Sequence, residues 1–262
     1  MATAATTERA QSADGTTIAF ERSGVGPGLI LVDAASGYRE FGPMRSLAEH
    51  LADDLTVIVY DRRGRGESSD TPPYSVQREV DDLVALIEMA GGTAFLYGYS
   101  SGALLAIQAA LNGLNVTKLA LLEPPIGTEE DRSGDRSFTE ELARLIDEGR
   151  RRDAVVFFQR SIGVPDEMID SMEPSFPALE AIAHTLVYDC LLSDATGLED
   201  ASRVTIPTLV IDSQASSADL TGWAASVAAA LPHGSHRSLP GEWHGVAGEV
   251  LAPVLVEFFK SG

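Results

Sequence analysis

The chain has 262 residues, a length that one large α/β domain with an insertion would fill. Hydrophobic residues make up 44% and charged residues 22%, which is ordinary for a globular protein and excludes disordered, collagen-like and coiled-coil classes. Acidic residues (39) outnumber basic ones (19), and the net charge of −20 opposes attraction to nucleic acid or to an anionic membrane. We therefore expect neither partner, and the composition leaves homo-oligomer formation open.

A single cysteine, Cys190, excludes an intramolecular disulfide framework and a cysteine-cluster metal site. Residues 1–13 have no apolar stretch after a basic start, so they do not resemble a signal peptide. No apolar run approaches the ~18 residues that cross a bilayer. We expect a cytoplasmic protein.

The first predicted element is a β-hairpin, with strands at 7–12 and 17–23 around an Asp-Gly turn. Short runs of consecutive apolar residues follow, typical of strands buried on both faces of a parallel sheet: 29–32, 56–60, 94–97, 119–122 and 208–211. Helical periodicity fills the intervals at 44–53, 76–90 and 101–111. This alternation predicts an α/β fold with a mostly parallel sheet flanked by helices.

The alternation stops between Pro124 and Arg203. Residues 129–136 are polar and charged, and helical patterns without strands follow at 140–152, 154–161 and 179–192. We expect residues 125–202 to form a helical cap inserted into a core made of residues 1–124 and 203–262. After strand 208–211 the sequence predicts a helix at 220–231, a strand near 236–239 and a closing helix at 246–260.

The segment Gly98-Tyr99-Ser100-Ser101-Gly102 lies where a predicted strand ends and a helix begins. This context matters because a nucleophilic serine on a sharp strand-to-helix turn needs small residues two positions before and after it. Gly98 and Gly102 meet that need, so we expect Ser100 to be the nucleophile. The alternative is a glycine-rich turn whose serine only caps the helix.

With this motif the chain resembles the α/β-hydrolase family over nearly its whole length. Residues 61–68, Asp-Arg-Arg-Gly-Arg-Gly-Glu-Ser, are similar to a turn that many members carry before the nucleophile. Residues 239–244, Leu-Pro-Gly-Glu-Trp-His, are similar to the late loop that delivers the catalytic histidine. We interpret the first segment as structural, with Arg63 tying loops together.

Five histidines compete for the role of general base. Only His244 follows the last predicted strand and precedes the last helix, where a loop can reach the serine. A neutral imidazole there can take the Ser100 proton and return it to the leaving group. We interpret His50 and His236 as solvated or core residues.

Members of the family complete the serine and histidine with an acidic residue, and in this chain the position of that acid departs from the family pattern. Relatives usually place it about five residues after the strand that follows the cap, where this chain has Ser216. Some members instead carry it after the strand that follows the nucleophile's helix, where this chain has Glu123 and two prolines. We expect Glu123 to hold His244. The alternatives are a solvated Glu123, with Asp212 or Asp219 as the acid.

The backbone N–H groups of Ala35 and Ser101 are the expected oxyanion donors. Where relatives commonly have His-Gly, this chain has Asp33-Ala-Ala-Ser-Gly. An ionised Asp33 would repel a developing oxyanion. Either its side chain turns into structural hydrogen bonds, or the site does something other than simple ester cleavage.

Substrate contacts are expected from Tyr99, beside the nucleophile, and from His184 in the cap. Other cap aromatics either line the pocket or pack the cap itself: Phe157, Phe158, Phe176 and Tyr188. Motifs for zinc, calcium or nucleotide phosphate are lacking, so no metal and no cofactor is expected.

These patterns predict a serine hydrolase that cleaves an ester, lactone or thioester of a small apolar compound through an acyl-enzyme. The alternative is a ligand-binding protein, or a lyase or cyclase, that uses the same pocket without hydrolysis. Asp33 and the unusual acid position motivate that alternative.

Overall fold

A computed structural model describes residues 6–127 and 135–261. In these parts the centre is an eight-stranded sheet with the order β1-β2-β4-β3-β5-β6-β7-β8. The strands are β1 (Glu8–Gln11), β2 (Thr17–Ser23), β3 (Gly28–Val32), β4 (Thr56–Tyr60), β5 (Ala94–Tyr99), β6 (Val116–Leu122), β7 (Thr208–Ser213) and β8 (Gly234–Leu239). Strand β2 pairs antiparallel with both β1 and β4, and the other five pairs of strands are parallel. The predicted fold class is confirmed.

Helices cover both faces of the sheet, which is why its central strands are apolar on both sides. Along β3, Ile30 and Val32 join one apolar cluster, whereas Leu29 and Leu31 join the cluster on the opposite face. The helices on the first face are α2 (Val76–Met89), α3 (Ser101–Leu111) and α10 (Ala218–Ala230). Those on the second are α1 (Met44–Leu51) and α11 (Gly248–Lys260).

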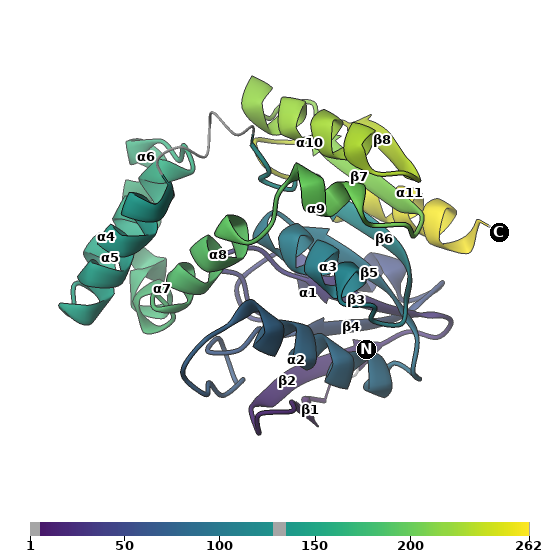
Figure 1. Ribbon diagram of the computed structural model, residues 1–262, viewed down its shortest axis with the longest axis horizontal. Coiled ribbons are helices and arrows are strands. Elements are labelled where there is room, and N and C mark those ends of the chain that lie inside the picture. Colours follow the sequence, from purple (N-terminus) through teal and green to yellow (C-terminus); the bar gives the residue numbers. More distant parts are fainter. Residues whose placement is uncertain (1–5, 128–134, 262) are drawn as a thin grey trace.

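Between β6 and β7 the described residues form helices and no strand. Five of them share an apolar cluster of their own, and we call these the cap helices: α4 (Asp135–Asp147), α5 (Arg151–Ser161), α6 (Asp166–Ser171), α7 (Phe176–Ala181) and α8 (Thr185–Asp194). Figure 1 shows α4 to α7 beside the sheet, with α8 leading back to the core. The last helix before β7, α9 (Leu198–Ser202), packs with the main core. Of the expected cap range, residues 128–134 lie outside the described part.

The residues singled out by their motifs follow the carboxyl ends of parallel strands. Asp33 follows β3, Ser100 follows β5, Glu123 follows β6, and His244 lies on the loop after β8. This edge is where an open α/β sheet binds its ligand. None of the described helices is long and apolar enough to cross a membrane.

Candidate active site

Ser100 occupies a sharp turn between β5 and α3, with a φ of 52° and a ψ of −121°. Larger neighbours would not fit this turn. A Cβ at Gly98 would lie 2.5 Å from the Cα of Ala103, and one at Gly102 would lie 2.2 Å from a carbonyl oxygen of β3. The two glycines therefore let strand and helix approach each other, as the sequence predicts.

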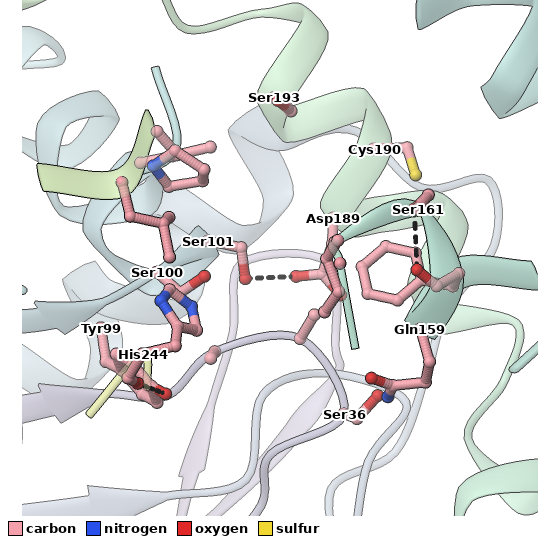
Figure 2. A pocket seen from close by; sticks show the side chains of 18 of the residues that line it. Ser36, Tyr99, Ser100, Ser101, Gln159, Ser161, Asp189, Cys190, Ser193 and His244 are labelled. Carbon is pink, nitrogen blue, oxygen red and sulfur yellow. Dashed lines mark hydrogen bonds between the residues drawn. The ribbon is translucent and has the colours of Figure 1, made fainter. Parts of the chain in front are cut away.

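His244 lines the same pocket as Ser100, on the loop between β8 and α11. Its N–H donates to the Ser216 hydroxyl (2.9 Å), and its carbonyl accepts a hydrogen bond from the Tyr99 hydroxyl. These bonds hold the loop at a residue whose φ is 53°. Figure 2 shows the imidazole drawn in the same part of the pocket as the Ser100 side chain.

Glu123 faces His244 from the end of β6. Its Oε2 lies 2.6 Å from Nδ1 of His244, within hydrogen-bonding distance. Its Oε1 accepts a hydrogen bond from the Ser213 N–H (2.8 Å) at the end of β7. Because Nδ1 is engaged by the carboxylate, Nε2 is the ring nitrogen left for Ser100.

Glu123 is fully buried, yet its surroundings keep it ionised. Burial by itself raises the pKa of this carboxyl. Hydrogen bonds from His244, from the Ser216 hydroxyl and from the Ser213 N–H outweigh that effect and hold the pKa below its ordinary value. Ser216, at the usual position of the family's acid, holds the His244 backbone by accepting its N–H.

The alternative carboxylates have other positions. Asp212 pairs with His236 on β8 and accepts a hydrogen bond from the Ser238 hydroxyl (2.5 Å). Asp219 is an exposed residue in the first turn of α10 that lines the pocket. Among the described residues, neither forms a hydrogen bond with His244.

The loop after β3, which carries Ala35, begins against the nucleophile turn, since an added Cβ at Gly102 would lie 2.7 Å from the Asp33 carbonyl oxygen. A tight turn shapes this loop, in which the Gly37 N–H donates to the Ala34 carbonyl (3.1 Å) and Ser36 has a φ of 65°. Within the described part of the chain, the Ala35 N–H has no hydrogen-bond acceptor. Ala35 and Ser101 both line the pocket, as an oxyanion hole requires.

Asp33 is folded into this loop. Its Oδ1 accepts the Ala34 N–H (2.8 Å), and Oδ2 has no partner within the described chain. The carboxyl fills the space where Gly37 and Gly42 lack a Cβ, since a Cβ there would lie 2.4 Å from Cγ and 2.5 Å from Oδ2, respectively. Burial raises the pKa of Asp33 to about 7, so its negative charge is reduced near neutrality.

Backbone strain concentrates at this site. Among the described residues, only four non-glycine residues have a positive φ: Ser36, Ser100, Glu123 and His244. Each such conformation costs of order 1–3 kcal/mol and persists only when the surrounding structure enforces it. Such strain is typical of catalytic sites, and here it marks the oxyanion loop and the three expected triad members.

The pocket in front of Ser100 has a volume of about 760 Å³, enough for a small organic molecule. Its aromatic lining comes from the core and the cap: Phe41, Tyr99, Phe138, Phe158, Trp223 and Trp243. Among its described lining residues there is no lysine or arginine, whereas four carry carboxyl groups: Asp33, Asp189, Asp194 and Asp219. In the described parts of the chain, no group of three or more His, Cys, Asp or Glu residues is placed to hold a metal ion.

The two residues expected to contact substrate lie in different places. Tyr99 lines the pocket, and its hydroxyl holds the His244 loop. His184 does not line this pocket: its Nε2 lies 3.4 Å from Asp70, and the ring faces the Gly64 turn. Of the other cap aromatics considered, Phe158 lines the pocket, whereas Phe157, Phe176 and Tyr188 do not.

A buried ion network beside the oxyanion loop escaped the sequence reasoning. Arg62 and Arg65, from the turn after β4, both pair with Asp189 of α8 at 2.7 and 2.6 Å. Arg63 of the same turn does what was expected and ties loops together, through Asp82 and Asp14. Two features signal the network: three arginines within four residues of an acidic chain, and a carboxylate, Asp189, in the middle of a mostly apolar cap helix.

Comparison with known proteins agrees with this geometry. The model of the alpha/beta hydrolase family matches residues 23–253. The chain belongs to the alpha/beta hydrolase family. A curated relative, the uncharacterized hydrolase YraK of Bacillus subtilis (strain 168), is 28% identical over 116 residues, and this match spans 43% of the chain and 42% of YraK.

Solved structures of alpha/beta hydrolases resemble the whole chain. An alpha/beta hydrolase from Sphaerobacter thermophilus is 45% identical, with a TM-score of 0.89 over 97% of this chain and all of the other. An esterase from Exiguobacterium antarcticum has a TM-score of 0.78 at 19% identity, covering 98% of this chain and 100% of the esterase. This second likeness concerns the fold alone.

Proposed function

We propose that this alpha/beta hydrolase is a serine esterase that cleaves an ester, lactone or thioester of a small apolar compound through an acyl-enzyme on Ser100. The observation that carries the proposal is the 2.6 Å hydrogen bond between Glu123 and His244, at a pocket that also contains the strained Ser100. A buried acid, an imidazole and a serine on a sharp turn together make a nucleophile.

In the first half-reaction, the Ser100 hydroxyl oxygen attacks the substrate's carbonyl carbon while Nε2 of His244 takes its proton. The ionised Glu123 stabilises the imidazolium that forms and keeps the ring in one orientation. The Ala35 and Ser101 N–H groups receive the developing negative oxygen. When the intermediate collapses, His244 gives the proton to the departing alcohol or thiol, and Ser100 is left acylated.

In the second half-reaction, His244 takes a proton from water, whose oxygen attacks the acyl carbon. The acid leaves and Ser100 recovers its proton. Asp33 is compatible with this sequence because its carboxyl is folded into the loop and its pKa is raised to about 7 by burial. Its charge thus opposes the oxyanion less than an ordinary aspartate would.

The lining of the pocket supports a substrate without negative charge. Aromatic side chains supply most of its large surfaces, and a carboxylate on the substrate would be repelled by Asp219, an exposed carboxylate of the lining. Short, uncharged p-nitrophenyl esters are therefore the first substrates to test.

The experiment treats the protein with a fluorophosphonate probe and, separately, with p-nitrophenyl butyrate. We expect stoichiometric labelling that mass spectrometry maps to Ser100, and turnover that Ser100→Ala lowers by several orders of magnitude. The Ser100→Ala variant should accelerate hydrolysis by at most about 10³ to 10⁴-fold over the uncatalysed reaction in water, which is the part that binding and the oxyanion donors supply.

Ser101→Ala is the matched control for the nucleophile assignment, because it removes the neighbouring hydroxyl and keeps Ser100. It should still be labelled. A wild-type protein that is neither labelled nor active on uncharged esters, yet binds a small molecule and leaves its mass unchanged, would instead indicate the non-hydrolytic alternative.

A further inference from the structure

The Arg62–Arg65–Asp189 cluster connects the cap to the core below the pocket. All three side chains are buried, at 1%, 1% and 3% exposure. Glu79 balances the second positive charge by pairing with Arg62 through both of its oxygens, each at 2.8 Å. Burial alone would raise the pKa of Asp189, but Arg65 and Arg62 outweigh it and keep the pKa below its ordinary value. Asp189 is thus an ionised acceptor at the base of the cap.

Arg65 also reaches the oxyanion loop. Its Nη1 donates to the Ala34 carbonyl (2.6 Å) and to the Gly37 carbonyl (3.2 Å). The Ala34 carbonyl and the Ala35 N–H belong to one trans peptide, in which they point in opposite directions. A guanidinium on the carbonyl therefore fixes the direction of the N–H, and by drawing charge toward the oxygen it makes the N–H a stronger donor.

Asp189 reaches the other side of the hole. The Ser101 hydroxyl donates to Oδ1 of Asp189 (2.8 Å), a bond drawn as a dashed line in Figure 2. The same carboxylate receives Arg65 on Oδ2 at 2.6 Å. One cap residue thus connects the residue that carries one expected oxyanion donor to the arginine that holds the peptide of the other.

Arg63 is a buried arginine of the same turn that lacks contacts with the oxyanion loop and with Asp189. It is equally buried and equally well paired, with Asp82 (2.7 and 2.8 Å), Asp14 (3.0 Å) and the Arg78 carbonyl (2.8 Å). These partners lie on α2 and in the β1–β2 turn, so within the described chain Arg63 forms no hydrogen bond with the oxyanion loop or the cap. Arg63 is therefore a matched comparison for the effect of removing a buried, paired arginine.

We propose that Arg65 and Asp189 are positioning residues for the oxyanion hole. Arg65 orients and polarises the Ala34–Ala35 peptide, and Asp189, carried by cap helix α8, holds Arg65 and Ser101 in register. The hole is complete only when α8 is docked on the core. This inference rests on the proposed esterase function for its kinetic consequence, but the orientation of the peptide does not depend on it.

The kinetic test compares Arg65→Met with Arg63→Met on p-nitrophenyl butyrate. We expect Arg65→Met to lower kcat by about 10 to 100-fold, somewhat less than the loss of an oxyanion donor itself, with KM within about threefold of wild type. A trifluoromethyl ketone, which forms a tetrahedral oxyanion on the serine, should lose affinity by a similar factor. Arg65→Lys should restore part of kcat, because its ammonium still donates to the Ala34 carbonyl.

Arg63→Met should lower the midpoint of urea unfolding and leave kcat and the ketone affinity within about threefold. Equal kcat losses in the Arg63 and Arg65 variants would overturn the proposal, because the effect would then be general destabilisation. If Arg65→Met does not fold, Asp189→Asn takes its place. It keeps the shape of the side chain, removes the charge that holds Arg65, and should likewise lower kcat and the ketone affinity together.

A second measurement is independent of catalysis. In protein labelled with ¹⁵N-alanine, the Ala35 amide proton should shift and exchange faster in Arg65→Met, whereas Arg63→Met should leave it unchanged. An unchanged Ala35 resonance in Arg65→Met would overturn the proposal even if activity falls. If wild-type protein neither hydrolyses esters nor reacts with the fluorophosphonate, the proposed function fails, and this resonance still decides whether Arg65 orients the peptide.

Discussion

Two hydrogen bonds converge on the Glu123 carboxylate, and they determine how it acts on His244. Nδ1 of His244 binds Oε2 and the Ser213 N–H donates to Oε1, so the carboxylate is fixed against the ring. Glu123 itself has a φ of 47°, which sets the direction in which its side chain leaves the strand. The acid is therefore held through both of its oxygens before any substrate arrives.

Replacing Glu123 by Gln should lower kcat by about 10² to 10⁴-fold, because a neutral amide neither stabilises the imidazolium nor selects the correct tautomer. Asp212→Asn, the matched removal of a neighbouring strand-end carboxylate, should leave kcat within about threefold, since Asp212 pairs with His236 instead. Initial rates with p-nitrophenyl butyrate measure both variants, and circular dichroism checks that they fold. The reverse ranking would assign the acid to Asp212.

Asp33 should make stability depend on pH in a direction opposite to that of a paired carboxylate. Burial raises its pKa from 3.8 to about 7 in the folded state, so between these values the folded chain holds a proton that the unfolded chain has lost. Stability therefore falls as pH rises from about 4 to 7. Asp33→Asn cannot ionise, and its advantage over wild type should grow across this interval, by roughly 4 kcal/mol at most.

Urea unfolding of wild type and Asp33→Asn at pH 4.5 and pH 8 measures this advantage. Asp61→Asn is a useful comparison, because Asp61 is equally buried but pairs with Arg39. An Asp33→Asn advantage that is the same at both pH values would show that Asp33 does not titrate in this interval.

At the scale of an element, the loop after β3 is built around the Asp33 side chain. The atoms nearest to an added Cβ at Gly37 all belong to Asp33, the closest at 2.4 Å, and the backbone of Gly37 does not have a positive φ. Gly37→Ala should thus destabilise the protein by about 1–3 kcal/mol through overpacking alone. The loop should shift as well, so kcat should fall with it.

Shortening the other partner should relieve the clash. In the double variant Asp33→Ala with Gly37→Ala, we expect the added Cβ to cost less than it does in wild type, which gives a favourable coupling in a double-mutant cycle. Urea unfolding of the four proteins measures the coupling. Purely additive losses would mean that the loop backbone, and not Asp33, rejects a side chain at Gly37.

The cap helices show where the sequence pattern could not give the boundaries. One expected helix ran from 140 to 152, but α4 ends at Asp147 because Gly149 has a φ of 74° and the Arg150 N–H turns back to the Leu145 carbonyl (2.9 Å). That glycine was a readable signal for the end of the helix. The expected helix at 179–192 is divided into α7 and α8 without any glycine or proline at the break.

The reason for this second break is tertiary. Thr185 begins α8, its hydroxyl accepts from Arg65 (3.2 Å) and donates to the Ile182 carbonyl (2.8 Å), and Asp189 follows one turn later. Contacts between residues more than a hundred positions apart thus fix the direction of α8. Local periodicity contains no information about such partners, so it could not place His184 outside the residues that line the pocket.

For the whole molecule, the fold and the sites at strand ends were predictable for one reason. A parallel sheet needs continuous apolar strands, and it brings the residues after their carboxyl ends to one edge. The sequence therefore predicts that Ser100, Glu123 and the His244 loop lie at the same edge. The contacts of Arg65 and Asp189 with the oxyanion loop could not be predicted, because these two residues meet only after helix α8 packs on the core. Motifs and sheet topology thus predict the residues at the strand ends, whereas the packing of the cap decides which distant residues support them.

The net charge of −20 and the lining of the pocket act in the same direction on the choice of substrate. A carboxylate brought within about 8 Å of another at an effective dielectric of 20 to 80 is opposed by roughly 0.5–2 kcal/mol. Because Asp219 is an exposed carboxylate of the pocket, kcat/KM for p-nitrophenyl hexanoate should exceed that for mono-p-nitrophenyl adipate, an acyl chain of equal length ending in a carboxylate, by about 2 to 30-fold. Because salt screens the interaction between exposed charges more than about 10 Å apart at 0.1 M, the ratio of the two kcat/KM values should shrink as salt is added.

Asp219→Asn, which removes an exposed carboxylate of the pocket, should raise the adipate rate and leave the hexanoate rate unchanged. Equal rates on the two esters at low salt would show that the acyl group does not reach Asp219.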